Sequence, residues 1–441
     1  MRCRSVHCLA IFLLCVLPGL AMASSAPQSV PAAVSDLLLN ADWSYSEDAS
    51  KGPEGLEQAA FAPVDLPHSW NSLDATDSEP GYRRDASWYR KQLEFAAGAS
   101  GFRHILYFEG ANMRAEVFVN GERAGGHVGG YLGFEIEITD LLDFQGVNDI
   151  LVRVDNSVDR SLIPSQKADF VMFGGLTRDV YLQVRPGVHI NAVQIDTPAV
   201  SLDEAQVSST VFVSGRDEAE GDYQLELKVF DPNGDEVSRS RADVTAGLGD
   251  SSHPVELPPI GNPELWSPDS PSLYTLEIAL KNGNDVVHRH AEKFGLRWYE
   301  FAQDGAFILN GQRLLLRGTH RHEEHAGYGA AMPDELHVRD MEMIKGMGAN
   351  FVRLGHYPQD PSVYRAADPL GPLLGDALPP RRRGLGDEDS KRNTDSLRGE
   401  LTTQNRTHPS VIFWSHGNET FWLPDYVRGG DEAAMNDYLR R

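Results

Sequence analysis

An amide and a carboxylate that could bind and protonate a polar substrate stand together near the carboxyl end of the chain. Asn418 and Glu419 follow a strand-like run over residues 411–415. Where strands alternate with helices, reactive side chains gather at the carboxyl ends of the parallel strands. A carboxylate there can act as a general acid or base, and the alternative is a loop carboxylate that only contacts water. This placement makes Glu419 the leading candidate for a catalytic residue.

Further polar candidates accompany an earlier strand-like run. Arg353 lies inside the run over residues 350–354, and His356 follows it after one residue. Such a histidine can contact a ligand or only shape a turn. Such an arginine can support an acidic site or form a buried structural ion pair. The residues alone leave these alternatives open.

Charged and titratable residues crowd the segment after Leu316, and their types invite a metal interpretation. The residues are Arg317, His320, His322, Glu323, Glu324 and His325. Histidine and glutamate are common zinc ligands. Contiguous side chains diverge from one another, however, so we expect hydrogen bonding here and predict no metal site.

The elements before these residues are strands. Residues 36–186 contain short runs that alternate apolar and polar side chains, such as 115–119, which ends in the hairpin dipeptide Asn120-Gly121. This pattern predicts a jelly-roll-like β-sandwich. Residues 187–297 continue it, with a clean alternation over 223–230 before a turn. Their length and pattern predict an immunoglobulin-like β-sandwich.

The pattern of predicted elements changes after residue 297. Strand-like and helical runs now alternate, which is typical of βαβ units and a parallel sheet. The strand-like runs are 314–316, 350–354, 373–374 and 411–415, and the helical runs are 334–347, 362–367 and 389–404. A (β/α)8 TIM barrel needs about 250 residues, so residues 298–441 are predicted to form an incomplete one. Trp414 is expected in its core.

Composition and the first residues restrict the class of protein. The 441 residues include 40 Lys and Arg against 64 Asp and Glu, a formal net charge of −24. Binding to phosphate backbones needs a basic surface, so we predict no nucleic-acid partner. Basic residues, a short apolar run and Ala21-Met22-Ala23 are typical of a signal peptide over residues 1–23. We therefore expect a periplasmic or secreted protein with no membrane association after signal removal.

Several motifs, in a shared order, resemble glycoside hydrolase family 2, the β-galactosidase, β-glucuronidase and β-mannosidase group. They include Leu-Pro-His-Ser-Trp-Asn at 66–71, Gly-Gly-Leu-Thr-Arg-Asp-Val at 174–180, Arg-Gly-Thr-His-Arg-His-Glu at 317–323, Val-Arg-Leu-Gly-His-Tyr-Pro at 352–358 and His-Pro-Ser-Val-Ile-Phe-Trp-Ser-His-Gly-Asn-Glu at 408–419. The resemblance implies a retaining exo-β-glycosidase that hydrolyses terminal β-linked sugars of glycosides, oligosaccharides or polysaccharides, with β-galactosidase favoured. It implies no cofactor, and it leaves a homo-oligomer open.

The resemblance also implies residue roles. Glu419 is the general acid and base, Asn418 and His356 contact the sugar, and Arg353 supports the acidic site. Asp169, in the loop before the 174–180 motif, binds sugar hydroxyls, and its alternative is a loop aspartate that contacts water.

Two departures from the family pattern lead to an alternative prediction for the function. The family's nucleophile is a glutamate near the seventh barrel strand, beyond the last residue, Arg441, so we expect a carboxy-terminally truncated barrel. In residues 366–383, Pro369 and Pro372 oppose a helix end and a buried strand, as a reading-frame error would produce. The alternative function is a catalytically inactive fragment or a carbohydrate-binding protein.

Overall fold

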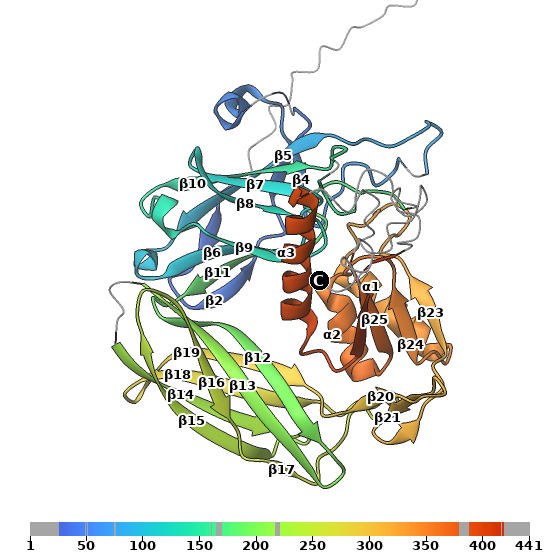
Figure 1. Cartoon of the computed structure of the whole chain (residues 1–441). Helices are drawn as coiled ribbons and strands as arrows, with labels where there is room; N and C mark the ends of the chain where they lie inside the picture. Colours follow the sequence, from blue (N-terminus) through green and yellow to red (C-terminus); the bar gives the residue numbers. More distant parts are fainter. Residues whose placement is uncertain are drawn as a thin grey trace, which may run out of the picture.

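The chain folds into two β-sandwiches and a strand–helix region, which lies beside both of them (Figure 1). The computed structural model describes residues 26–418 except 49, 51, 75, 160, 165–169, 217–220, 379–387 and 416. The predicted signal peptide, Asp169 and Glu419 lie outside the described residues.

Two facing sheets form the first sandwich. One has the order β4-β3-β5-β10-β7-β8, with β1 joining β5 in parallel, and the other has the order β2-β11-β6-β9. Alternate side chains of β7 are buried, as its sequence predicts, and the hairpin after it turns at Gly121 with a φ of 85°. The strands are β1 Gln28–Val30, β2 Ser35–Leu38, β3 Trp43–Ser46, β4 Ala62–Val64, β5 Ala86–Phe95, β6 Arg103–Phe108, β7 Arg114–Val119, β8 Glu122–Val128, β9 Phe134–Glu137, β10 Val147–Asp155 and β11 Val180–Arg185.

The second sandwich is immunoglobulin-like. A sheet of order β12-β13-β16, with β17 on β13, faces a sheet of order β15-β14-β18-β19. Its apolar core includes Leu225, Leu227 and Val229, the inward residues of β14. The strands are β12 His189–Val200, β13 Glu204–Gly215, β14 Gly221–Phe230, β15 Glu236–Ala246, β16 Gly249–Glu256, β17 Ile260–Gly261, β18 Tyr274–Asn282 and β19 Asp285–Phe294.

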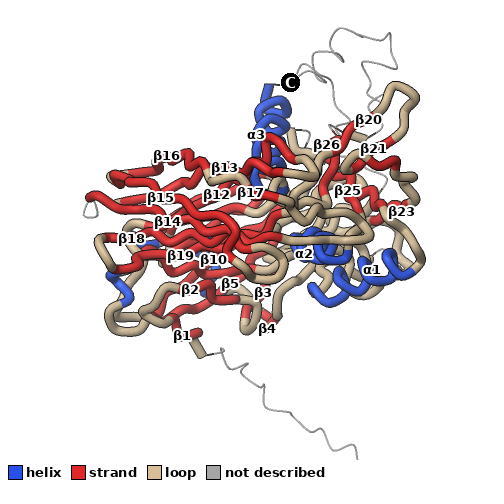
Figure 2. The backbone as a smooth tube through the Cα atoms, turned by 90° about the horizontal axis from the view of Figure 1, so that it is seen from below, coloured by secondary structure: helices blue, strands red, loops and turns tan. Residues whose placement is uncertain are grey.

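The remaining elements form a small antiparallel sheet and then a parallel one. The parallel sheet has the order β23-β24-β25-β26, and α1 and α2 pack side by side against it (Figure 2). Asp360 caps α2 by accepting from the Ser362 N–H at 2.8 Å. The elements are β20 Tyr299–Phe301, β21 Phe307–Leu309, β22 Gln312–Arg313, β23 Gly318–Arg321, α1 Asp334–Gly346, β24 Phe351–Leu354, α2 Pro361–Leu370, β25 Leu373–Ala377, α3 Glu388–Asn405 and β26 Val411–Ser415.

The predicted strand over residues 314–316 is wrong, because the first strand of the parallel sheet is β23, a few residues later. Leu314 and Leu316 instead pack with Trp266 and Phe307 in an apolar cluster beneath the sheet. Leu315 is 69% exposed. The apolar run therefore covers one end of the sheet rather than pairing within it.

The two prolines do not break the structure as expected. Helix α2 continues through Pro369 and ends at Gly371, whose φ of 92° stops the helix. Pro369 removes one helical hydrogen bond, and because it lies in the last turn, no further turn of the helix depends on that bond. Pro372 precedes β25, so it interrupts no part of that strand, and all five residues of β25 are buried.

Helix α3 lies between the first sandwich and the parallel sheet (Figure 1). The Gln404 side chain accepts from the Gly133 N–H at 3.0 Å and donates to the Gly133 carbonyl at 2.8 Å. His127 Nε2 lies 3.1 Å from Glu400 Oε2. Among the helices in the described part of the chain, none is long and apolar enough to cross a membrane.

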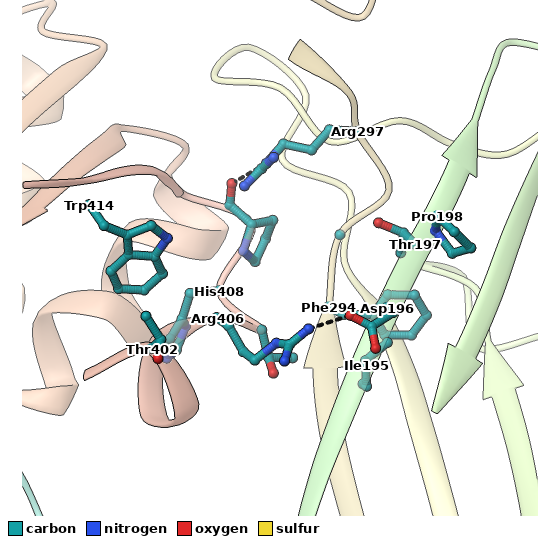
Figure 3. Close-up of a pocket in the computed structure, with 13 residues that line it drawn as sticks. Ile195, Asp196, Thr197, Pro198, Phe294, Arg297, Thr402, Arg406, His408 and Trp414 are labelled. Carbon is teal, nitrogen blue, oxygen red and sulfur yellow. Dashed lines mark hydrogen bonds and ion pairs between the residues drawn. The ribbon is translucent and has the colours of Figure 1, made fainter. Parts of the chain in front are cut away.

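Polar contacts also bridge the second sandwich and the parallel sheet. A cavity of about 660 Å³ lies between them (Figure 3). Arg297 donates to the carbonyls of Pro409 at 2.5 Å and Val411 at 2.6 Å, and Arg406 pairs with Asp196 across the gap. Trp414, expected in the core, is half-buried and lines this cavity.

An acidic residue is buried where the first sandwich meets α2. Glu109 follows β6, and one of its carboxylate oxygens lies 3.5 Å from Arg365 Nη1. Within the described residues, the other oxygen has no hydrogen-bond partner. Burial raises the pKa of Glu109 to about 8, and Asp360, Asp179 and Asp334 add to the increase against the opposing effect of Arg365.

We predict that Glu109→Gln makes the free energy of unfolding less sensitive to pH between about 5 and 8. The folded-state pKa lies above the ordinary value of 4.5, so Glu109 costs stability as pH rises from about 4.5 to 8. Relative to the wild type, the variant should gain on the order of 3–4 kcal/mol between pH 5 and 8. Urea unfolding across that range measures the difference. The exposed Glu300→Gln serves as control, and the same difference at every pH would contradict the prediction.

Candidate active site at the carboxyl edge of the parallel sheet

The parallel sheet brings the candidate residues to one edge. His320 of β23 pairs with Arg353 of β24, which pairs with Gly375 of β25, which pairs with Phe413 of β26. The segments that carry His356 and Asn418 follow β24 and β26, so both leave the sheet at its carboxyl ends. This is the edge where barrel enzymes hold their reactive groups.

Two of the predicted site residues are in direct contact. Arg353 Nη2 donates to Asn418 Oδ1 at 2.8 Å. Asn418 is buried, and the bond requires its amide oxygen to face the guanidinium. The amide nitrogen, which can only donate, therefore points elsewhere. The structure thus holds the residue before Glu419 in one orientation.

Histidines form a second group at the same edge. His356 is buried, and its ring centroid lies 4.8 Å from that of His320 and 5.1 Å from that of His322. From the sequence, His320 and His322 are expected to form hydrogen bonds, and no contact between them and His356 is predicted. Their spacing of two residues, at and just after the end of β23, favours the same side of the sheet, and this signal could have grouped them with His356.

The structure brings together histidines that the sequence predicts to diverge. The expected divergence of contiguous side chains fails for His320 and His322, whose ring nitrogens lie within 4.8 Å of each other and of a His356 nitrogen. Three imidazoles at this spacing are the ligand type that zinc, copper and nickel prefer. Among the described residues, they are a group that could hold a cation at this edge.

A deeper group of possible ligands already has positive charge beside it. Glu323, His337 and Asp360 are buried together. Arg178 pairs with Glu323 at 3.0 Å, and Arg321 Nη2 lies 2.9 Å from His337 Nδ1. These guanidinium groups supply the charge that a metal ion would otherwise provide.

The first sandwich also reaches the site. Phe170 lies between β10 and β11, and its ring centroid is 5.8 Å from that of His322 and 6.5 Å from that of His356. Asp169 precedes Phe170 in the sequence, and Glu419 follows Asn418. Because both acids lie outside the described residues, their roles stay predictions.

A buried carboxylate of β25 points away from the site. Asp376 accepts from the Tyr364 hydroxyl at 2.8 Å and from Asn405 Nδ2 at 3.1 Å. Burial raises its pKa to about 6, against the opposing effect of these hydrogen bonds. Since Tyr364 and Asn405 belong to α2 and α3, Asp376 lies beneath the helices and does not line the carboxyl edge.

Models of one protein family match three consecutive parts of the chain. The sugar binding domain of glycosyl hydrolases family 2 matches residues 54–186. The model described as glycosyl hydrolases family 2 matches residues 188–297, and the family 2 TIM barrel domain matches residues 302–379.

Curated relatives match most of this chain. It is 48% identical to a putative beta-glucuronidase of Formosa agariphila, over 91% of this chain and 48% of the relative. It is 32% identical to a beta-glucuronidase of Bacteroides fragilis, over 87% of this chain and 56% of the relative. It is 30% identical to a beta-galactosidase of Thermoanaerobacter pseudethanolicus, over 90% of this chain and 54% of the relative. The chain therefore spans about half the length of these relatives.

A solved structure shares the fold. The crystal structure of a Bacteroides uniformis beta-glucuronidase matches with a TM-score of 0.84 and 30% identity, over 92% of this chain and 49% of that one. The match confirms the predicted fold class, a jelly-roll-like sandwich and an immunoglobulin-like sandwich followed by part of a TIM barrel. By its fold and by three consecutive family matches, this chain belongs to the glycosyl hydrolases family 2.

Proposed function

We propose that this protein forms part of a retaining exo-β-glycosidase site for terminal β-linked sugars. The observation that carries the proposal is the hydrogen bond from Arg353 to Asn418, at the carboxyl edge that also holds His356. An oriented amide beside a carboxylic acid suits a sugar, because the amide can donate to a ring hydroxyl while the acid protonates the leaving oxygen.

In the proposed reaction, Glu419 donates a proton to the glycosidic oxygen and later takes one from the attacking water. Retaining enzymes need a second carboxylate about 5–5.5 Å from the first, which attacks the sugar and forms a covalent intermediate. We assign that nucleophile to no residue of this sequence. The Asn418 amide and His356 hold the sugar hydroxyls, and their hydrogen bonds accelerate the reaction if they strengthen in the transition state.

We propose a β-glucuronide as the substrate, in place of the β-galactoside that the sequence favours. Two supports favour the acidic sugar. Arg353 and the three histidines make the carboxyl edge rich in groups that bind a carboxylate. The Formosa agariphila relative, at 48% identity, is named a putative beta-glucuronidase. The β-galactoside stays the second candidate, because the Thermoanaerobacter pseudethanolicus relative is named a beta-galactosidase.

Export is part of the proposal. Residues 1–23 have the composition of a signal peptide. We predict that the protein recovered from a Gram-negative host lies outside the cytoplasm and begins at Ser24. Fractionation and intact mass measure both, and a cytoplasmic product that retains residues 1–23 would contradict the prediction.

We predict that Glu419→Gln abolishes most of the hydrolysis of nitrophenyl β-glucuronide. Losing the residue that takes a proton from the attacking water should reduce kcat by about 10²–10⁴-fold. Nitrophenolate leaves with little help from an acid, so kcat/KM should fall less. Glu300→Gln, a change of the same kind at an exposed strand, should retain full activity. Proton NMR of the first product should show the β-anomer.

The same assay separates the alternatives. Faster hydrolysis of nitrophenyl β-galactoside than of the glucuronide would favour the second candidate. Undiminished turnover by Glu419→Gln would disprove the proposed mechanism. A wild-type protein that binds sugars without hydrolysing either substrate would support the non-catalytic alternative.

We predict that Arg353→Lys weakens catalysis more than sugar binding. Lysine keeps the positive charge but loses the planar donor fork that orients Asn418. Losing one charge-assisted hydrogen bond should lower kcat by about 10–100-fold with a smaller change in KM. Arg313→Lys, at an exposed strand end, is the matched control. Equal kinetics for both variants would show that the Arg353 contact is only structural.

A further inference from the structure

Arg178 of the first sandwich reaches across to the parallel sheet. It lies just before β11, and its guanidinium forms a two-pronged ion pair with Glu323, with Nη2 to Oε2 at 3.0 Å and Nε to Oε1 at 3.2 Å. The side chains of the pair are only 2% and 1% exposed. A planar guanidinium in this geometry fixes the direction as well as the distance of its partner.

The same guanidinium holds two site segments at once. Glu323 directly follows His322, and Pro358 comes two residues after His356. Arg178 Nη2 donates to the Pro358 carbonyl at 2.7 Å as well as to Glu323. One side chain from the sandwich is therefore hydrogen-bonded to the two segments that carry His322 and His356.

Further contacts join the two segments to each other. Glu323 Oε2 accepts from the Asp360 N–H at 3.1 Å, and the Glu323 N–H donates to the Tyr357 hydroxyl at 3.2 Å. Tyr131 of the sandwich stacks on Tyr357 with ring centroids 4.3 Å apart. Its carbonyl accepts from Arg178 Nη1 at 2.8 Å. The polar contacts of Arg178 and Glu323 thus form one buried network behind the histidines.

Other contacts also hold the first sandwich against the parallel sheet. Helix α3 already bridges sandwich and sheet through the Gln404–Gly133 bonds and the His127–Glu400 contact. Apolar side chains of both domains also pack in a shared cluster. A buried ion pair is weak evidence for stability, because desolvation offsets much of the attraction between the charges. What the pair adds is a defined position for the segments it touches.

We propose that Arg178 is a positioning residue for the candidate active site, which sets His322 and His356 through Glu323 and the Pro358 carbonyl. The first sandwich then contributes to the geometry of the candidate active site. The proposal rests on the proposed function for its consequence in catalysis, but the placement of the histidines can be measured without any turnover.

The test is NMR of the full chain with 13C-labelled histidine, with the His322 and His356 imidazole signals assigned from single His→Gln variants. In Arg178→Lys, these two signals should shift or broaden, because lysine cannot hold Glu323 and Pro358 together. In Glu400→Gln, which alters another contact of the same domain junction, both signals should stay in place. Unchanged His322 and His356 signals in a folded Arg178→Lys protein would overturn the proposal.

A double variant covers the case in which Arg178→Lys fails to fold. Replacing a buried ion pair by apolar residues of similar size often preserves stability, so Arg178→Met with Glu323→Met should fold. Displaced histidine signals in this variant would support the proposal, and native signals would overturn it. Where turnover is present, kcat/KM should fall by up to about 10²-fold, as a small misplacement near reacting groups can produce. Absent turnover with displaced signals would count against the proposed function and not against the positioning role.

Discussion

A buried ion pair between Arg178 and Glu323, residues far apart in the sequence, joins the first sandwich to the parallel sheet. Removing both charges from water costs several kcal/mol for each ion, and their attraction offsets this only when the remaining polar atoms are bonded too. That condition is met here, because the carbonyls of Tyr131 and Pro358 accept from the same guanidinium. The pair is fully bonded in this arrangement of the domains, and it therefore constrains the segments around it.

The carboxylates near this pair show that partners, rather than depth, decide where protons reside. Glu109 and Asp360 are almost equally buried, at 3% and 2% exposure. Burial alone would raise both pKa values, but Arg178, His337 and the bonds from Ser362 bring the pKa of Asp360 below its ordinary value. Burial raises the pKa of Glu109 to about 8, because the cation that faces it among the described residues, Arg365 at 3.5 Å, offsets little of that effect. The junction therefore holds an ionised carboxylate beside Arg178 and a protonated one close by.

Local patterns predicted much of the fold, because they depend on neighbours in the sequence. The alternation over 223–230 reappears in β14, and the helix expected from residue 334 is α1. Errors occurred where tertiary packing outweighs pattern. The Leu314–Leu316 run covers the end of a sheet, and a last-turn proline leaves α2 intact. A short apolar run does not specify whether it pairs within a sheet or packs against one.

The candidate site, like the fold, was predictable only where local sequence determines it. The ends of strand-like runs identify Arg353, His356 and Asn418 as candidates, since parallel strands deliver their following residues to one edge. No pattern in the sequence pairs Arg353 with Asn418, or Arg178 with Glu323, because those contacts depend on how separate elements pack. The positions of candidate residues are thus local information, whereas their orientation is a property of the assembled domains. For this reason the sandwich that supplies Arg178 and Phe170 belongs to the physical description of the site as much as the sheet that carries the histidines.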